Sequence, residues 1–138
     1  MLRIELRSWE EARALAAPIR FAVFVAEQGV PPGIELDEMD PLSLHVLAFE
    51  DERAIGTARL LPDGHIGRMA VLEAWRGRGI GGRMLARLID EARLRHHREV
   101  VLSAQVHAAR FYRAHGFVEE GADYLEAGIA HRRMTRRL

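Results

Sequence analysis

The chain has 138 residues, of which 49% are apolar and 29% charged, a composition typical of one globular domain with a substantial core. Its formal net charge is zero, which gives no overall electrostatic attraction to nucleic acid. Cysteine is absent, and this excludes disulfides, a thiolate nucleophile and cysteine-bound metals.

The N-terminal residues 2–7 alternate apolar and charged side chains, which predicts a half-buried strand. They lack the apolar core of a signal peptide, and no apolar run is long enough to span a bilayer. We therefore expect a cytoplasmic protein that does not bind membranes. Ser8, with Glu11 three residues later, predicts a helix start with a capping box. Pro18 should interrupt this helix or begin a second one.

An acidic loop is predicted over residues 28–41, which are rich in glycine and proline. Its carboxylates fit a solvated surface loop, or a wall that attracts a cationic amine, and both interpretations stay open. The acidic residues of this region are Glu27, Glu35, Asp37, Glu38 and Asp40. Just before it, Ile19, Val23 and Phe24 share one helical face, which favours the core over a ligand contact.

Three apolar segments, residues 44–49, 54–61 and 65–72, predict consecutive antiparallel strands. Asp63-Gly64 is a strong signal for a hairpin between the second and the third. Gly67 indicates a bulge or a close backbone approach in the third strand.

The C-terminal half alternates helices and strands. The predicted elements are a helix over 80–94, a strand over 100–102, a helix over 107–115 and strands over 117–120 and 128–134. Gly116 should end the second of these helices. The resulting order is β, α-α, β-β-β, α, β, α, β-β, which is a mixed α/β fold in one domain over residues 1–138.

A glycine-rich stretch, Arg76-Gly77-Arg78-Gly79-Ile80-Gly81-Gly82-Arg83, connects a predicted strand to a predicted helix. The first turn of a helix has backbone N–H groups without partners, and the helix dipole adds partial positive charge there. Glycines let a ligand approach the main chain, so a phosphate or pyrophosphate is the expected guest. The chain has no lysine, which excludes the nucleotide P-loop, and the dinucleotide pattern G-x-G-x-x-G matches only weakly.

Further motifs lie in register around this stretch. Arg76, Gly79 and Gly81 form the pattern Arg-x-x-Gly-x-Gly, and Gly67-Arg68-Met69-Ala70-Val71 precedes it. Residues 108–117 read A-x-x-F-Y-x-x-x-G-F, and residues 20–30 read RFAVFVAEQGV. Together these motifs resemble signatures of the GNAT superfamily of N-acetyltransferases, in particular its small bacterial members. The resemblance covers nearly the whole chain. It implies a mixed, mostly antiparallel central sheet of six to seven strands, with about four helices packed on both faces.

The same resemblance implies direct attack of a primary amine on acetyl-CoA in a ternary complex, without a metal ion. A bulge in the strand at Gly67 would turn N–H groups of Met69 and Val71 toward the thioester carbonyl. The residues implied to bind acetyl-CoA are Met69, Ala70, Val71, Arg76, Gly77, Arg78, Gly79, Ile80, Gly81, Gly82, Arg83, Gln105 and Phe111. Gln105 departs from the asparagine often found there, but its amide can still bond the pantetheine arm.

Tyr112 is the predicted general acid, because family members place a tyrosine of this motif near the thioester sulfur. Its alternative role is packing between helix and sheet. The general base is open among carboxylates and histidines, with Glu27 or Glu35 preferred over the others. The remaining candidates are Asp37, His45 and His131.

Two other functions stay open. A non-catalytic acyl-CoA-binding module would keep the glycine turn and lose the chemistry. An acyltransferase with another donor is the second, because residues 20–27 also resemble acyl-homoserine-lactone synthases. The sequence does not identify the acceptor amine or the oligomeric state, although GNAT proteins often form homodimers.

Overall fold

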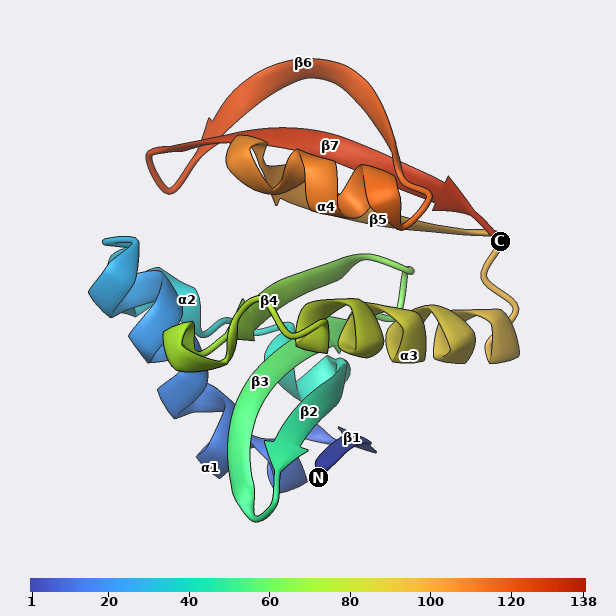
Figure 1. Cartoon of the computed structure of the whole chain (residues 1–138). Coiled ribbons are helices and arrows are strands. Elements are labelled where there is room, and N and C mark those ends of the chain that lie inside the picture. The colour runs from blue at the N-terminus through green and yellow to red at the C-terminus, as the bar shows by residue number, and fades with distance from the viewer.

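The computed structural model describes residues 1–138, apart from the side chain of Ile34. Its first sheet is antiparallel, with the strand order β1-β2-β3-β4 (Figure 1). The strands are β1 (Leu2–Arg7), β2 (Leu44–Glu50), β3 (Arg53–Leu60) and β4 (Ile66–Val71). A tight turn at Gly64, with φ of 93°, confirms the predicted hairpin between β3 and β4.

The second sheet is also antiparallel, with the order β5-β7-β6. Its strands are β5 (Glu99–Gln105), β6 (Val118–Glu126) and β7 (Ile129–Arg137). A parallel bridge between His65 and Val101 links it to the first sheet just before β4 begins. The prediction of one central sheet was therefore wrong in this respect, since the seven strands of residues 1–138 form two sheets. β4 contains a bulge, and bulges bend a strand and interrupt its pairing.

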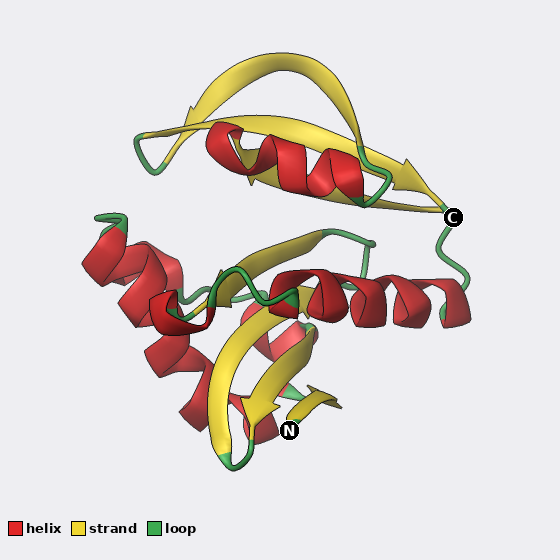
Figure 2. Ribbon diagram, in the orientation of Figure 1, coloured by secondary structure: helices red, strands yellow, loops and turns green.

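Helices cover both faces of the first sheet, as Figure 2 shows. The helices are α1 (Trp9–Arg20), α2 (Pro32–Glu35), α3 (Ile80–Leu94) and α4 (Ala109–Ala114), with a π-helix, η1 (Phe21–Glu27), and three short 3-10 turns, η2 (Asp40–Leu42), η3 (Glu73–Trp75) and η4 (Val106–Ala108). Of these, α1 and α3 pack on the first sheet, and α4 packs on β5 of the second. Because α2 is a single turn of four residues, three α-helices of the described chain exceed one turn, and the expected four are confirmed only in part.

Alternate side chains of β2 point to opposite faces of the first sheet, which explains why helices pack on both faces. Leu47 and Phe49 pack with Ala12 and Ala16 of α1 on one face. Val46 and Ala48 point to the opposite face and join the larger core, to which Met84, Leu85 and Leu88 of α3 belong. The core extends to the second sheet through Leu102, Ala104, Phe117 and Met134.

The N-terminal helix begins as predicted, since the Glu11 amide donates to Ser8 Oγ at 3.3 Å. The prediction for Pro18 was wrong. Pro18 lies inside α1. Because proline has no backbone N–H, the helix lacks one hydrogen bond there, and it continues past Pro18 into η1. Ile19 and Val23 are buried, which confirms the predicted core face.

The final hairpin is longer than its sequence pattern indicates. β6 was expected over residues 117–120 and continues to Glu126, with nearly every residue exposed. An exposed edge strand does not require alternating apolar residues, so the apolar pattern of the sequence indicates only part of β6. Within the described residues, no helix has the length and apolarity needed to span a membrane.

Candidate active site

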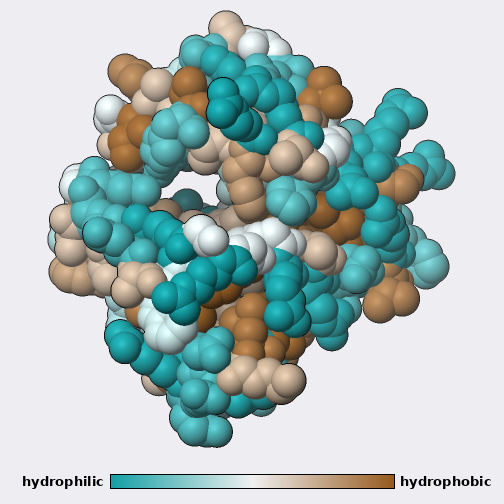
Figure 3. Space-filling view, in the orientation of Figure 1, coloured by the Kyte–Doolittle hydropathy of each residue, from teal (hydrophilic) through white to brown (hydrophobic). Residues whose placement is uncertain are grey.

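A cleft of about 960 Å³ lies where β4 and β5 separate. Figure 3 shows the molecule hollowed between the part that holds β5, β6, β7 and α4 and the part that holds the first sheet. Most of the predicted site residues line it: Glu35, Met69, Ala70, Val71, Arg76, Gly77, Gly79, Ile80, Gly81, Gly82, Gln105, Phe111 and Tyr112. Glu27, Arg78 and Arg83 are outside its lining.

One wall of the cleft is the glycine turn with the start of α3. Gly77 and Gly79 have φ of 78° and 76°, in the left-handed region that favours glycine. Gly79 is the N-cap of α3, and no described side chain caps this helix. The amides of the first turn, Ile80 to Gly82, are therefore available to an anion at the positive end of the helix dipole.

The arginines of this turn have separate roles. Arg76 binds both carboxylate oxygens of Glu27, at 2.9 and 2.8 Å, and donates from Nε to the Val71 carbonyl at 2.9 Å. It thus ties η1 to the glycine turn, and it occupies the Glu27 carboxylate that was preferred as a base. The Arg78 guanidinium lies 4.9 Å from the centre of the Trp75 ring, and Arg83 is exposed.

The bulge in β4 forms the middle of the cleft. Arg59 of β3 pairs with Gly67, whereas Thr57 pairs with Ala70, so β4 has one residue more than β3 between these pairs. Arg68 in the bulge has a φ of 50°, which is uncommon for a residue other than glycine. The bulge was predicted at Gly67 and lies one residue later. It turns the backbone of β4 at the segment, Met69 to Val71, that lines the cleft.

Tyr112 reaches the same cleft from α4. Its hydroxyl lies 3.9 Å from Met69 Sδ, and its ring packs edge-on against Phe111 and Phe117. Burial raises the pKa of Tyr112 to about 12. The hydroxyl therefore stays protonated at physiological pH and can act as a hydrogen-bond donor.

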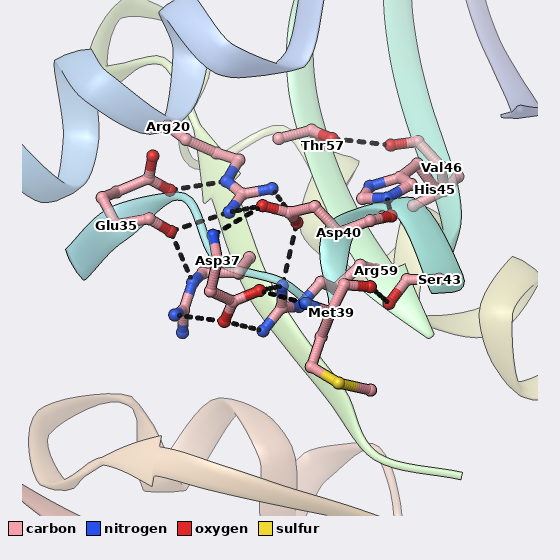
Figure 4. Close-up of polar contacts among 11 residues, drawn as sticks. Arg20, Glu35, Asp37, Met39, Asp40, Ser43, His45, Val46, Thr57 and Arg59 are labelled. Atoms are coloured by element: carbon pink, nitrogen blue, oxygen red, sulfur yellow. Dashed lines mark hydrogen bonds and ion pairs between the residues drawn. The ribbon is translucent and has the colours of Figure 1, made fainter. Parts of the chain in front are cut away.

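The acidic loop is neither a solvated loop nor a free acidic wall, so both interpretations need correction. Glu35 and Asp40 are buried, and Arg20, itself buried, donates to them at 2.5 and 2.7 Å (Figure 4). Arg59 donates to Asp37 at 2.6 Å and to Asp40 at 2.8 Å.

Arg68 completes this ion network, with Nη2 donating to Asp37 at 3.1 Å and Nε donating to the Glu35 carbonyl at 3.1 Å. Three arginines thus neutralise three carboxylates. Sequence reasoning missed Arg20, Arg59 and Arg68 as partners of the loop. The available signal was an arginine at position 59 on the inward face of an otherwise apolar strand.

The two histidines considered as bases lie in different places. His45 is fully buried, its Nε2 lies 2.9 Å from the Asp40 carbonyl, and burial lowers its pKa. It is outside the lining of the cleft and serves as a packing residue against Trp9. His131 lines the cleft, and so does Glu35, although Arg20 holds one oxygen of the Glu35 carboxylate.

The network gives a first prediction. Arg20→Leu leaves two buried carboxylates without their main partner, so the free energy of unfolding should fall by about 3–5 kcal/mol. Urea denaturation measures this loss. Arg93→Leu is the matched control, because Arg93 forms only an exposed pair with Asp90, and it should change stability by about 0.5 kcal/mol or less. Equal stability of the two variants would contradict the structural role of the network.

A second prediction concerns acid stability. The hydrogen bonds from Arg59 lower the pKa of Asp37 from 3.8 to about 2. Since the folded pKa lies below the unfolded one, the stabilisation is complete above about pH 4 and disappears as the pH falls toward 2. Asp37→Asn should lose at most about 2 kcal/mol at pH 6, and the difference from wild type should shrink between pH 4 and 2. A constant difference across this range in urea denaturation would argue against it.

Comparisons with known proteins agree with this geometry. The family model for the acetyltransferase (GNAT) domain matches residues 17–138. The uncharacterized N-acetyltransferase YjcF of Bacillus subtilis strain 168 is 34% identical over 131 residues, which cover 92% of this chain and 94% of YjcF. A crystal structure of an acyl-CoA N-acyltransferase from Pseudomonas aeruginosa superposes with a TM-score of 0.87 at 32% identity, covering 99% of each chain. Escherichia coli ElaA superposes with a TM-score of 0.86 at 28% identity, covering 98% of this chain and 99% of ElaA. The chain therefore belongs to the GNAT family of acetyltransferases, which implies an N-acyltransferase that uses an acyl-CoA.

Proposed function

We propose that this protein transfers the acetyl group of acetyl-CoA to a primary amine by direct attack within a ternary complex. The observation that carries the proposal is one cleft that combines three features. These are the uncapped N-terminus of α3 after the glycine turn, the bulge of β4 and the protonated hydroxyl of Tyr112. They correspond to an anion site, a source of backbone donors and a donor for a leaving group.

The donor substrate would enter along the face that α3 and α4 cover. Its pyrophosphate would accept hydrogen bonds from the amides of residues 78–82, with Arg78 and Arg83 adding positive charge nearby. Its pantetheine arm would lie between β4 and β5. Gln105, at the end of β5, donates to Gln28 at 2.7 Å, which leaves its own carbonyl oxygen free to accept from the arm.

The β4 bulge would serve the acyl carbonyl. When the amine attacks, negative charge develops on the thioester oxygen, and fixed backbone N–H groups of Met69 or Val71 would stabilise that charge. Met69 directly follows the left-handed Arg68 in the bulge, and Val71 lies two residues beyond Met69, which is consistent with this role.

Tyr112 would stabilise the departing thiolate by a hydrogen bond. Its pKa of about 12 exceeds the value of about 8.5 for a simple thiol, so complete proton transfer to the sulfur would be uphill by about 5 kcal/mol. A hydrogen bond to the developing negative charge needs no such transfer. The proposed role is therefore donation in the transition state, without ionisation of the tyrosine.

The placement of the pyrophosphate is tested with Gly81→Glu. A Cβ at Gly81 would meet Phe111 at 3.5 Å, an ordinary contact, so the variant should fold. Its carboxylate would occupy the anion site, and acetyl-CoA affinity measured by calorimetry should fall at least about 100-fold. Ala86→Glu adds the same charge to an exposed position of α3 and should bind normally. Unchanged affinity in Gly81→Glu would refute this placement.

The role of Tyr112 is tested with Tyr112→Phe. Loss of a donor to the leaving group should lower kcat about 100-fold, with acetyl-CoA affinity nearly unchanged. Thiol release measures kcat, and calorimetry measures affinity. Because the tyrosine stays neutral, the wild-type profile should show no loss of activity from its ionisation below about pH 10. A wild-type kcat in the variant would remove Tyr112 from the mechanism.

The activity itself is tested by calorimetric titration with acetyl-CoA, followed by thiol release over a panel of amines and of other acyl-CoA donors. Turnover of acetyl-CoA with one amine class would support the proposal. Faster turnover of a longer acyl-CoA would reassign the donor. Binding without turnover across the panel would favour a non-catalytic acyl-CoA-binding module.

A further inference from the structure

The wall of the cleft formed by the second sheet has a polar cluster on the face turned away from α4. Leu102, Ala104 and Met134 point into the core on the α4 side, so the alternate residues of these strands point the other way. Ser103 of β5, Tyr124 and Glu126 of β6, and His131 of β7 lie on that opposite face. The hydroxyls of Ser103 and Tyr124 are hydrogen-bonded, and Ser103 Oγ lies 3.5 Å from Glu126 Oε2.

A tight hairpin fixes the two titratable members of this cluster. Ala127 and Gly128, with φ of 51° and 76°, form a two-residue turn between β6 and β7, and Glu126 pairs with Ile129 across it. His131 is two residues farther along β7 and is paired with Gln105 of β5 on one side and Tyr124 of β6 on the other. It thus stands opposite the residue at which β5 ends, and both it and Gln105 line the cleft.

The hydrogen bond of His131 determines its tautomer. Nδ1 lies 2.7 Å from the Ile129 carbonyl oxygen, which can only accept, so Nδ1 must carry the proton. In the neutral ring, Nε2 then has the free lone pair. Nε2 lies 3.5 Å from Glu126 Oε2, and the Tyr124 ring stacks on the imidazole with centroids 6.2 Å apart. In the neutral ring, Nε2 is therefore the nitrogen that can accept a proton.

The other candidate bases in or near the cleft have ion-pair partners or lie on the side proposed for acetyl-CoA. Arg76 binds the Glu27 carboxylate, and the arginine network holds Glu35. His65 lies at the bridge that joins the sheets and is 3.0 Å from Asp63. His107, in η4, lies immediately before α4, on the side assigned above to acetyl-CoA.

We propose that His131 is the general base that deprotonates the acceptor amine, and that Glu126 attracts the incoming ammonium ion and stabilises the imidazolium that forms. This proposal rests on the proposed amine acetylation. It places the acceptor on the face of the β4–β5 opening opposite to the donor. It also assigns the acceptor class as an amine that is an ammonium ion in solution.

The proton balance follows from this assignment. His131 Nε2 takes one proton from the ammonium group, and the nitrogen lone pair forms the C–N bond with the thioester carbonyl carbon. When the C–S bond breaks, its electron pair leaves with sulfur, and the second proton lost by the nitrogen neutralises the thiolate. The products are an amide, the thiol of CoA and an imidazolium that returns its proton to solvent.

His131→Asn separates catalysis from structure, because the asparagine amide can still donate to the Ile129 carbonyl but has no counterpart of Nε2. We expect kcat/KM to fall about 100-fold, with acetyl-CoA affinity within about twofold of wild type. The wild-type loss of kcat/KM on the acidic side, caused by protonation of the base, should disappear in the variant. Glu126→Gln should lower kcat/KM about tenfold, and His96→Asn, an exposed histidine, should match wild type.

A measurement without substrate tests the tautomer of His131 on which the proposal depends, and it does not require the acceptor to be known. Imidazole nitrogen NMR of the wild-type protein, with His131→Asn identifying the resonance, should show the Nδ1–H tautomer of the neutral ring. An Nε2–H tautomer, or a wild-type pH profile in His131→Asn, would overturn the proposal. If no amine is acetylated by the wild-type enzyme, the proposed function fails, while the nitrogen spectrum still decides the state of His131.

Discussion

The pairing of buried charge by Arg20, Arg59 and Arg68 is the constraint on which the rest of the site depends. A carboxylate removed from water is tolerated only when partners supply charge and hydrogen bonds. Burial alone would raise the pKa of Asp40, yet the hydrogen bonds from Arg20 and the Asp37 amide, together with the charges of Arg20 and Arg59, lower it overall. These contacts join α1, the loop before β2, and strands β3 and β4, whose side chains otherwise belong to separate layers.

The same ion pairs explain how an unfavourable backbone conformation persists in β4. Arg68 adopts a positive φ, which costs about 1–3 kcal/mol in a residue with a Cβ. Its guanidinium is held by Asp37 and by the Glu35 carbonyl, so the network that buries the acidic loop also holds the bulge. Arg76 acts in the same way at the other end of β4, where it ties the Val71 carbonyl to Glu27 of η1. Ion pairs and hydrogen bonds thus hold β4, the strand at the edge of the cleft, at both of its ends. The partners of these contacts come from segments that are distant from β4 in sequence.

Local rules predicted the elements of this protein well, because strand alternation, helix periodicity and turn residues are encoded within a few positions. The glycine turn was also predictable, since an anion site at a helix start needs only glycine and an uncapped N-terminus. The pairing of the acidic loop was not, because Arg20, Arg59 and Arg68 come from three separate elements and each carboxylate alone fits a solvated surface. The division into two sheets was equally hidden, since it depends on where the pairing of β4 with β5 ends. Composition carries no signal for the tautomer of His131, which a carbonyl two residues away determines.

The two-sheet arrangement would give the proposed direct aminolysis of a thioester a geometric solution. An amine must meet the carbonyl carbon from a side that the donor does not occupy, and a single continuous sheet would close that approach with backbone hydrogen bonds. Here β4 and β5 touch at His65 and Val101 and then separate, so the gap is open to both faces. Tyr112 approaches it from the α4 side and His131 belongs to the opposite face of β7. In the proposed reaction, the neutral phenol of Tyr112 donates a hydrogen bond to the departing thiolate, and the imidazole lone pair of His131 accepts a proton from the ammonium ion. The separation of the sheets thus places the proposed hydrogen-bond donor to the sulfur and the proposed base on different faces of the cleft.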